Sequence, residues 1–202
     1  MRSEKPTITI IINNLIISPQ KWSAICRARD MKLYIISNRL PVKVSEKNGT
    51  FSFTRSEGGL ATGLDSLQTA YEKHWIGWPG ICVDNDSDKQ AIGEKLEELN
   101  FHPVFLSDTQ IKNYYEGYSN STIWPLCHYF FAYTLYKDTF WQAYQEVNKR
   151  FCETICRLIG PEDKVWVQDY QLMLLPGMLR EAVPDLCIGC LLYTSPSPRD
   201  RG

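Results

Sequence analysis

Short apolar runs alternate with longer stretches of helical periodicity from Met31 onward. Short apolar runs are typical of buried strands, whereas apolar residues three or four positions apart are typical of helices. The predicted strands cover residues 32–36, 74–78, 101–106, 164–168 and a segment from 186. The predicted helices cover residues 59–72, 88–99, 107–115, 138–158 and about 171–182. This alternation predicts an α/β fold, with a Rossmann-like parallel sheet and helices on both of its faces.

Two of the predicted helices have recognisable starts. Ser107 and Gln110 have the spacing of a capping box, and Asp138 stands as a cap before a periodic apolar run. Arg39 and Asp169 each follow an apolar strand. Because ligands of parallel sheets bind outside the carboxyl ends of the strands, we expect both side chains at one functional edge.

The charge balance argues against a general attraction for nucleic acid or membranes. Lysine plus arginine (22) nearly equals aspartate plus glutamate (23), which gives a net charge of -1. No apolar run is long enough for a membrane span. A small, locally recognised ligand is therefore expected.

The cysteines and histidines add little chemistry. Apart from Cys187 and Cys190 in CIGC, the seven cysteines form no C-x-x-C pair, and their scattered positions are typical of reduced thiols in a cytoplasmic protein. The three histidines lack metal-site spacing, so no metal ion or other cofactor is expected.

Several residues could bind a phosphorylated or sugar ligand. Arg39 offers a permanently charged planar fork suited to phosphate, although an arginine after a strand can also be a plain surface residue. Gly58 and Gly59 precede a predicted helix, where backbone amides could approach a phosphate or simply form a turn. Asp169 is either a helix cap or a carboxylate directed into a cleft.

Aromatic residues are unusually dense in two segments, with Gly, Asn and Ser between them. This mixture fits a sugar site, and filling of the apolar core is the alternative. The residues are Trp75, Trp78, Tyr114, Tyr115, Tyr118 and Trp124.

Six motifs occur in a fixed order along the chain. They are ISNRLPV, EGGLATGL, WIGWPG, YYEGYSNSTIWPLCHY, WQAYQEVNKRF and VWVQDYQLMLLPGMLR. In order and spacing this set resembles the N-terminal half of the trehalose-6-phosphate synthase family, over about residues 31–189. The resemblance implies the N-terminal half of a two-domain GT-B glycosyltransferase, with residues 31–189 as an incomplete acceptor domain.

The resemblance also assigns roles to individual residues. It implies that Arg39 binds the phosphate of glucose 6-phosphate and that Tyr115 and Trp124 complete this pocket. It implies that Trp78 lies against the acceptor sugar and that Asp169 binds an acceptor hydroxyl as a catalytic-site residue.

On the donor side, the same resemblance implies that the amide of Gly59, next to Gly58, faces the diphosphate of UDP-glucose. The implied reaction moves glucose from UDP-glucose to glucose 6-phosphate with retention and without a metal, giving trehalose 6-phosphate. The implied partners are these two small molecules, and a homo-oligomer of the full-length form is allowed.

Three departures from the family pattern qualify these expectations. Residues 1–30 have no counterpart, so we expect a non-native or disordered leader. The tail CLLYTSPSPRDRG replaces a histidine-containing segment. Codons that can encode this tail match a sequencing-library adapter, so we expect residues 190–202 to be an artefact; a Ser/Pro-rich disordered end is the alternative.

The third departure concerns the basic residues that hold UDP-glucose, which the resemblance places in the other half of the family fold. We therefore expect the 202-residue chain itself to be inactive in transfer. The alternative function is that of a non-catalytic regulatory protein that binds a sugar phosphate.

Overall fold

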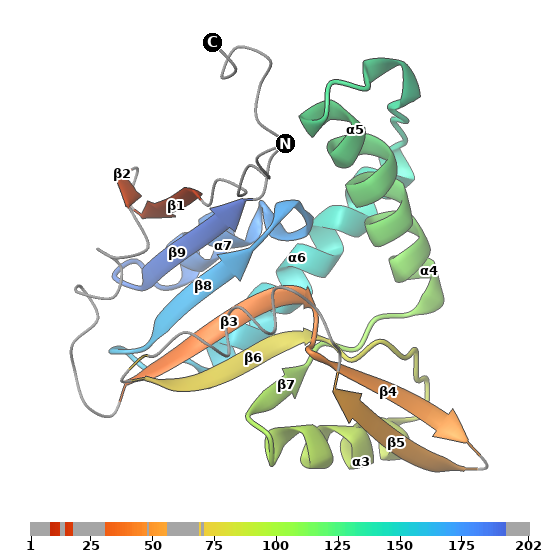
Figure 1. Ribbon diagram of the computed structural model, residues 1–202, viewed down its shortest axis with the longest axis vertical. Helices are drawn as coiled ribbons and strands as arrows, with labels where there is room; N and C mark the ends of the chain where they lie inside the picture. Colours follow the sequence, from red (N-terminus) through yellow and green to blue (C-terminus); the bar gives the residue numbers. More distant parts are fainter. Residues whose placement is uncertain are drawn as a thin grey trace, which may run out of the picture.

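The computed structural model describes residues 9–12, 15–17, 31–47, 49–55, 69 and 71–192. A seven-stranded sheet with the order β2-β1-β9-β8-β3-β6-β7 forms its centre (Figure 1). The strands from β9 to β7 pair in parallel, whereas β1 is antiparallel to both β2 and β9. The strands are β1 (Thr9–Ile12), β2 (Leu15–Ile17), β3 (Lys32–Arg39), β6 (Glu72–Trp78), β7 (Phe101–Pro103), β8 (Lys164–Gln168) and β9 (Cys187–Leu192).

Helices cover both faces of the parallel part of the sheet (Figure 1). One face packs against α6 (Asp138–Leu158) and α7 (Leu175–Ala182), and the other packs against α3 (Asp86–Glu97). Successive side chains of β3 point to opposite faces of the sheet and so contribute to both layers. Tyr34 and Ile36 belong to one apolar cluster, and Leu33 and Ile35 belong to the other. The expected α/β fold with a parallel sheet is therefore confirmed.

The remaining elements lie near one end of the sheet. They are the hairpin β4 (Val42–Lys47) and β5 (Thr50–Arg55), the short α4 (Asp108–Gln110), the π-helix η1 (Ile111–Ile123), α5 (Trp124–Cys127), and the 3-10 turns η2 (Phe131–Tyr133) and η3 (Tyr170–Leu172). The hairpin was not expected from the sequence, because β4 and β5 place polar residues on their exposed sides and bury few apolar ones.

Most of the predicted elements are confirmed, with changes at their ends. The strand predicted over residues 101–106 is shorter in the structure, because β7 ends at Pro103. The capping box of Ser107 and Gln110 is present, but the helix continues past residue 115 as η1. The expected cap at Asp138 is wrong by one residue, because Lys137 is the extended cap and Asp138 begins the helix.

The structure does not test the helix predicted before β6 or the domain limits predicted near the two ends of the chain. The helix predicted over residues 59–72 lies largely outside the described residues. Strands β1 and β2 come from the expected leader, and β9 extends beyond Gly189 to Leu192. The proposed domain limits at 30 and 189 stay predictions.

Two further observations bear on the class of protein. No helix in the described part of the chain has both the length and the apolar character needed to cross a membrane. The Sγ atoms of Cys152 and Cys156 lie 4.0 Å apart, so these two residues are thiols, as expected.

Candidate functional site

The carboxyl end of β3 carries an irregularity that positions Arg39. The pairing between β3 and β6 shifts register between Ile36 and Arg39. The buried Ser37 hydroxyl donates a hydrogen bond to the Arg39 carbonyl oxygen at 2.8 Å. Gly77 permits this bend, because a Cβ there would lie 2.8 Å from the Ser37 carbonyl oxygen and 2.9 Å from the Leu40 nitrogen.

The Arg39 guanidinium lies over the ring of Trp78, with its central carbon 5.3 Å from the ring centroid. This is the distance of a cation–π contact. The indole nitrogen of Trp78 donates a hydrogen bond to the Ile81 carbonyl oxygen at 3.1 Å, which fixes the orientation of the ring. Gly80 leaves room for the guanidinium, since a Cβ there would lie 2.9 Å from Arg39 Nε.

The π-helix η1 is tied to the same end of β3. The hydroxyl of Tyr114 donates a hydrogen bond to Asn38 Oδ1 at 2.9 Å. Tyr114 is fully buried, and this burial is the main reason that its pKa lies well above the ordinary value. The phenol therefore stays a neutral donor, and it holds η1 against the residue that precedes Arg39.

Tyr115 and Trp124 stand at two points of the segment formed by η1 and α5. Tyr115 is partly buried against the apolar cluster beneath the sheet. Trp124 is 40% exposed and stacks on His128, with ring centroids 4.1 Å apart and planes inclined by 22°. The aromatic residues of the expected site thus differ in burial, because Tyr114 lies in the core, Tyr118 is partly buried against it and Trp124 is exposed.

Asp169 follows β8, the strand that pairs with β3 on the side opposite β6. Its φ of 68° is a backbone conformation that L-residues rarely adopt. Its amide donates to the Leu191 carbonyl oxygen at 2.6 Å, and its carboxylate accepts from the Tyr170 amide at 2.9 Å. The capping role expected for Asp169 is therefore present, together with backbone strain of the kind that often marks functional sites.

The charge of Asp169 affects the pKa values of two other groups. Burial is the main reason that the pKa of Tyr170 is raised to about 12. The charge of Asp169 and, to a smaller extent, that of Tyr115 act in the same direction. Burial and then Asp169 also raise the pKa of the Cys127 thiol, at the end of α5. The neutral Tyr170 hydroxyl donates to Asn120 Oδ1 at 3.0 Å, which links the turn after β8 to η1.

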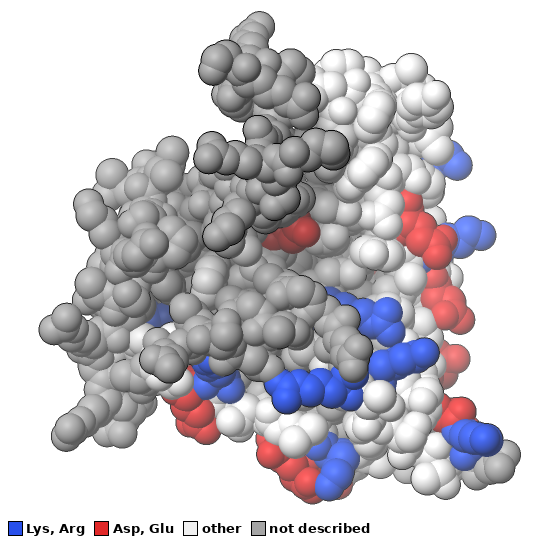
Figure 2. Space-filling model, in the orientation of Figure 1, with Lys and Arg blue, Asp and Glu red and all other residues white. Residues whose placement is uncertain are grey.

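The candidate site therefore forms where parallel strands β6, β3 and β8 end and where η1 and α5 lie beside them (Figure 1). Arg39 and Trp78 are in contact, and Asp169 follows the neighbouring strand. Gly58 and Gly59 lie outside the described residues. In the orientation of Figure 1, lysine and arginine side chains gather in the region of β3, β6 and the hairpin (Figure 2).

Sequence reasoning missed three residues that support this site. Asn38 holds Tyr114, while Gly77 and Gly80 leave space for the bend and for the Arg39 side chain. The two glycines of WIGWPG were a usable signal, because glycine beside a functional strand end often marks a close approach. The Asn38 contact had no local signal, since its partner lies 76 positions away in the sequence.

Comparison with known proteins gives consistent matches. Residues 31–199 match the model of glycosyltransferase family 20. The chain is 39% identical over 168 residues to an alpha,alpha-trehalose-phosphate synthase [UDP-forming] from Botryotinia fuckeliana, covering 81% of this chain and 32% of that protein. It is 42% identical over 165 residues to a trehalose-6-phosphate synthase from Mycobacterium ulcerans, covering 81% and 33% respectively.

Among solved structures, a similar one is an alpha,alpha-trehalose-phosphate synthase (UDP-forming) from Burkholderia vietnamiensis. The TM-score is 0.60 at 26% identity, covering 80% of this chain and 33% of that chain. A UDP-forming enzyme of the same name from Burkholderia xenovorans gives a TM-score of 0.55 at 28% identity, covering 75% and 30%. The chain thus spans about a third of the length of the curated relatives that it matches.

Proposed function

Because the chain belongs to glycosyltransferase family 20, we propose that it supplies the acceptor-binding part of an alpha,alpha-trehalose-phosphate synthase. The relatives' names specify UDP as one product and trehalose phosphate as the other. Trehalose consists of two joined glucose units, so the donor is UDP-glucose and the acceptor is glucose 6-phosphate. The observation that carries the proposal is the guanidinium of Arg39, held at the end of β3 beside an aromatic ring.

Arg39 is the proposed ligand of the acceptor phosphate. Its planar fork can donate two parallel hydrogen bonds to phosphate oxygens while its face rests on Trp78. This contact with Trp78 and the neighbouring Gly80 limit the positions of the side chain before the ligand arrives. A preorganised cation loses less conformational entropy on binding than a mobile one.

The remaining side chains are proposed to orient the sugar ring. Trp124 keeps an exposed aromatic face, and Tyr115 lies on the same helical segment. Asp169 carries a carboxylate that can accept a hydrogen bond from a sugar hydroxyl, in addition to the one from the Tyr170 amide. These groups would set the direction in which the anomeric hydroxyl of the acceptor faces the donor.

In the proposed reaction, the anomeric oxygen of the acceptor bonds to C1 of the donor glucose as the bond from C1 to the UDP oxygen breaks. The proton of the attacking hydroxyl moves to the departing diphosphate, so UDP leaves as the second product. With retention, attack and departure occur on the same face of the sugar. The contribution of Arg39 and Asp169 is alignment of the acceptor, which lowers the entropic part of the barrier.

Isothermal titration calorimetry with glucose 6-phosphate tests the proposal on the 202-residue chain. We expect Arg39→Met to weaken binding by roughly 10-fold to 100-fold, because a charged hydrogen bond contributes about 1.5–3 kcal/mol. Lys43→Met is the matched control, since Lys43 is an exposed cation on the nearby β4. Equal affinities of the Arg39→Met variant and the unchanged chain would refute the assigned role of Arg39.

A further inference from the structure

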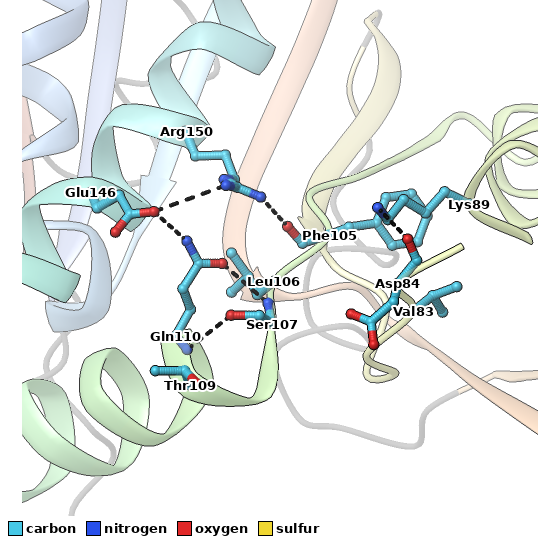
Figure 3. Close-up of a pocket in the computed structure, with 10 residues that line it drawn as sticks. All are labelled: Val83, Asp84, Lys89, Phe105, Leu106, Ser107, Thr109, Gln110, Glu146 and Arg150. Atoms are coloured by element: carbon cyan, nitrogen blue, oxygen red, sulfur yellow. Dashed lines mark hydrogen bonds and ion pairs between the residues drawn. The ribbon is translucent and has the colours of Figure 1, made fainter. Parts of the chain in front are cut away.

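A pocket with a volume of about 340 Å³ lies beside the segments that follow β6 and β7, and Arg39 is not among its lining residues. Five parts of the chain line it: the segment after β6, α3, the segment after β7, α4 and α6. Figure 3 shows Glu146, Arg150 and Gln110 on one side of this pocket, with Lys89 and Asp84 across from them. We propose that this pocket binds a neutral mono- or disaccharide and that its occupancy changes the affinity of the Arg39 site.

The charges of the lining favour a neutral ligand over an anion. The cations Lys89 and Arg150 are balanced by the carboxylates of Asp84 and Glu146. Lys89 Nζ also contacts Asp86 Oδ1 at 3.0 Å, and Arg150 Nη2 lies 3.9 Å from Glu146 Oε1. An incoming phosphate would therefore meet a lining with no net positive charge.

The polar groups provide both donors and acceptors, which hydroxyl groups need. Arg150 Nη1 donates to the Phe105 carbonyl oxygen at 3.0 Å, and Gln110 Nε2 donates to Glu146 Oε1 at 2.6 Å. Arg150 has five N–H groups and the Glu146 carboxylate has two oxygens, so both retain capacity for a ligand. The ion pair between them is exposed, and such pairs are weak enough to exchange for ligand contacts.

The remaining lining suits the apolar surface of a sugar ring. Val83, Phe105 and the buried Leu106 contribute carbon surface to the lining, with Leu106 close to Gln110 and Val83 beside Asp84 (Figure 3). Aromatic and aliphatic surface combined with a few placed polar groups is the usual composition of a small-molecule site. The volume lies near the lower end of the range for such sites, which favours one or two sugar rings.

Two of the chain segments that line this pocket also reach the candidate functional site. Val83 lies in the same segment as Ile81, whose carbonyl oxygen accepts the hydrogen bond from Trp78. On the other side, Gln110 immediately precedes η1, which carries Tyr115. A ligand that draws these two segments together would change the positions of Trp78 and Tyr115, so binding at the two sites would be coupled.

The binding test uses amide nuclear magnetic resonance spectra of the chain, recorded while glucose or maltose is added. We expect saturable shifts at Ser107, Thr109 and Gln110, and we expect Arg150→Met to reduce the affinity by about 10-fold. Lys149→Met is the matched control, because Lys149 is the neighbouring exposed cation on α6 and does not line the pocket. Repeating the titration with Arg39→Met separates this site from the acceptor site, since the shifts should persist there.

Three results would overturn the binding claim. They are an absence of saturable shifts in the pocket with both sugars, shifts that disappear in Arg39→Met, and tighter binding of inorganic phosphate than of either sugar. If Arg150→Met alters the fold, Glu146→Gln provides a second variant that keeps an acceptor oxygen for Gln110 and removes the charge.

The coupling claim rests on the proposed function and has its own test. Maltose at saturation should change the affinity for glucose 6-phosphate at least about 2-fold, and glucose 6-phosphate should change the maltose affinity by the same factor. Unchanged affinities with the pocket occupied would overturn the coupling. Failure of glucose 6-phosphate to bind at all would instead count against the proposed function, and the pocket shifts would still report on saccharide binding.

Discussion

Arg39 and Gly80 occupy adjoining space, because a Cβ placed on Gly80 would lie 2.9 Å from Arg39 Nε and 3.0 Å from Arg39 Cζ. Gly80 also has a φ of 84°, a conformation that disfavours any L side chain. A glycine two residues beyond Trp78 therefore decides where the guanidinium can lie. This relationship leads to the first prediction.

Gly80→Ala should displace the Arg39 guanidinium from the Trp78 ring. We expect glucose 6-phosphate to bind at least about 10-fold more weakly and stability to fall by about 1–3 kcal/mol. Calorimetric titration and urea unfolding measure the two effects. Gly93→Ala is the control, because nothing lies within 4 Å of a Cβ there, in the middle of α3. Unchanged ligand affinity in Gly80→Ala would show that the guanidinium position is unimportant.

Asp169 gives the second prediction, because strain and function are combined in one residue. Asp169→Gly should relieve the strain of the positive φ but remove the carboxylate from the site. The relief of about 1–3 kcal/mol should at least offset the loss of the capping hydrogen bond to the Tyr170 amide, because replacing a capping residue by glycine costs roughly a few tenths of a kcal/mol. We expect unchanged or higher stability in thermal unfolding, together with weaker binding of glucose 6-phosphate.

Asp169→Asn is the companion variant, because it keeps an oxygen for the Tyr170 amide and removes only the charge. It should keep the stability of the parent chain and bind glucose 6-phosphate more weakly. Normal binding by both variants would remove Asp169 from the proposed acceptor site.

The stacked pair His74 and His102 gives the third prediction, on pH. Their rings lie 5.2 Å apart with an interplanar angle of 15°, and His74 Nδ1 lies 3.0 Å from His102 Nε2. Burial lowers the pKa of His102 to about 4, and the charges of His74 and Lys32 act in the same direction. Burial is also the main cause of the lowered pKa of His74.

The sign of the effect follows from proton binding. Between pH 6.5 and about 4 the unfolded chain binds more protons at His102 than the folded chain, so stability falls as the pH falls. The loss from His102 alone is on the order of 3 kcal/mol as an upper bound. Urea unfolding at a series of pH values measures it. His102→Phe and His102→Gln should both flatten this acid limb, and a slope identical to that of the parent chain in both would contradict the assignment.

The fourth prediction concerns transfer by the 202-residue chain. This chain spans about a third of the length of its curated relatives, and the family resemblance places the basic residues that hold UDP-glucose in the other half of the fold. We expect binding of glucose 6-phosphate without formation of trehalose 6-phosphate. Mass spectrometry of a reaction with UDP-glucose and glucose 6-phosphate measures the product, and its appearance at a rate proportional to protein concentration would disprove this expectation.

The residues that support the candidate site were the least predictable part of the molecule. The sequence alone indicated Arg39 and Asp169, because strand ends in a parallel sheet are recognisable from apolar runs, and it indicated Trp78 only as one of a dense group of aromatic residues. It did not indicate the bend after Ile36, the hydrogen bond from Tyr114 to Asn38, or the π-helical backbone of η1. Each of these depends on contacts between segments that are distant in the chain.

By itself, the sequence determined the alternating order of strands and helices and the residue types at the strand ends, because burial on both faces requires continuous apolar strands. Only the tertiary structure decided that Arg39 contacts Trp78 and that Asp169 adopts a positive φ. Periodicity records which residues are buried, but it carries no information on register. The register between β3 and β6, fixed by packing around Gly77, is what brings Arg39 to Trp78.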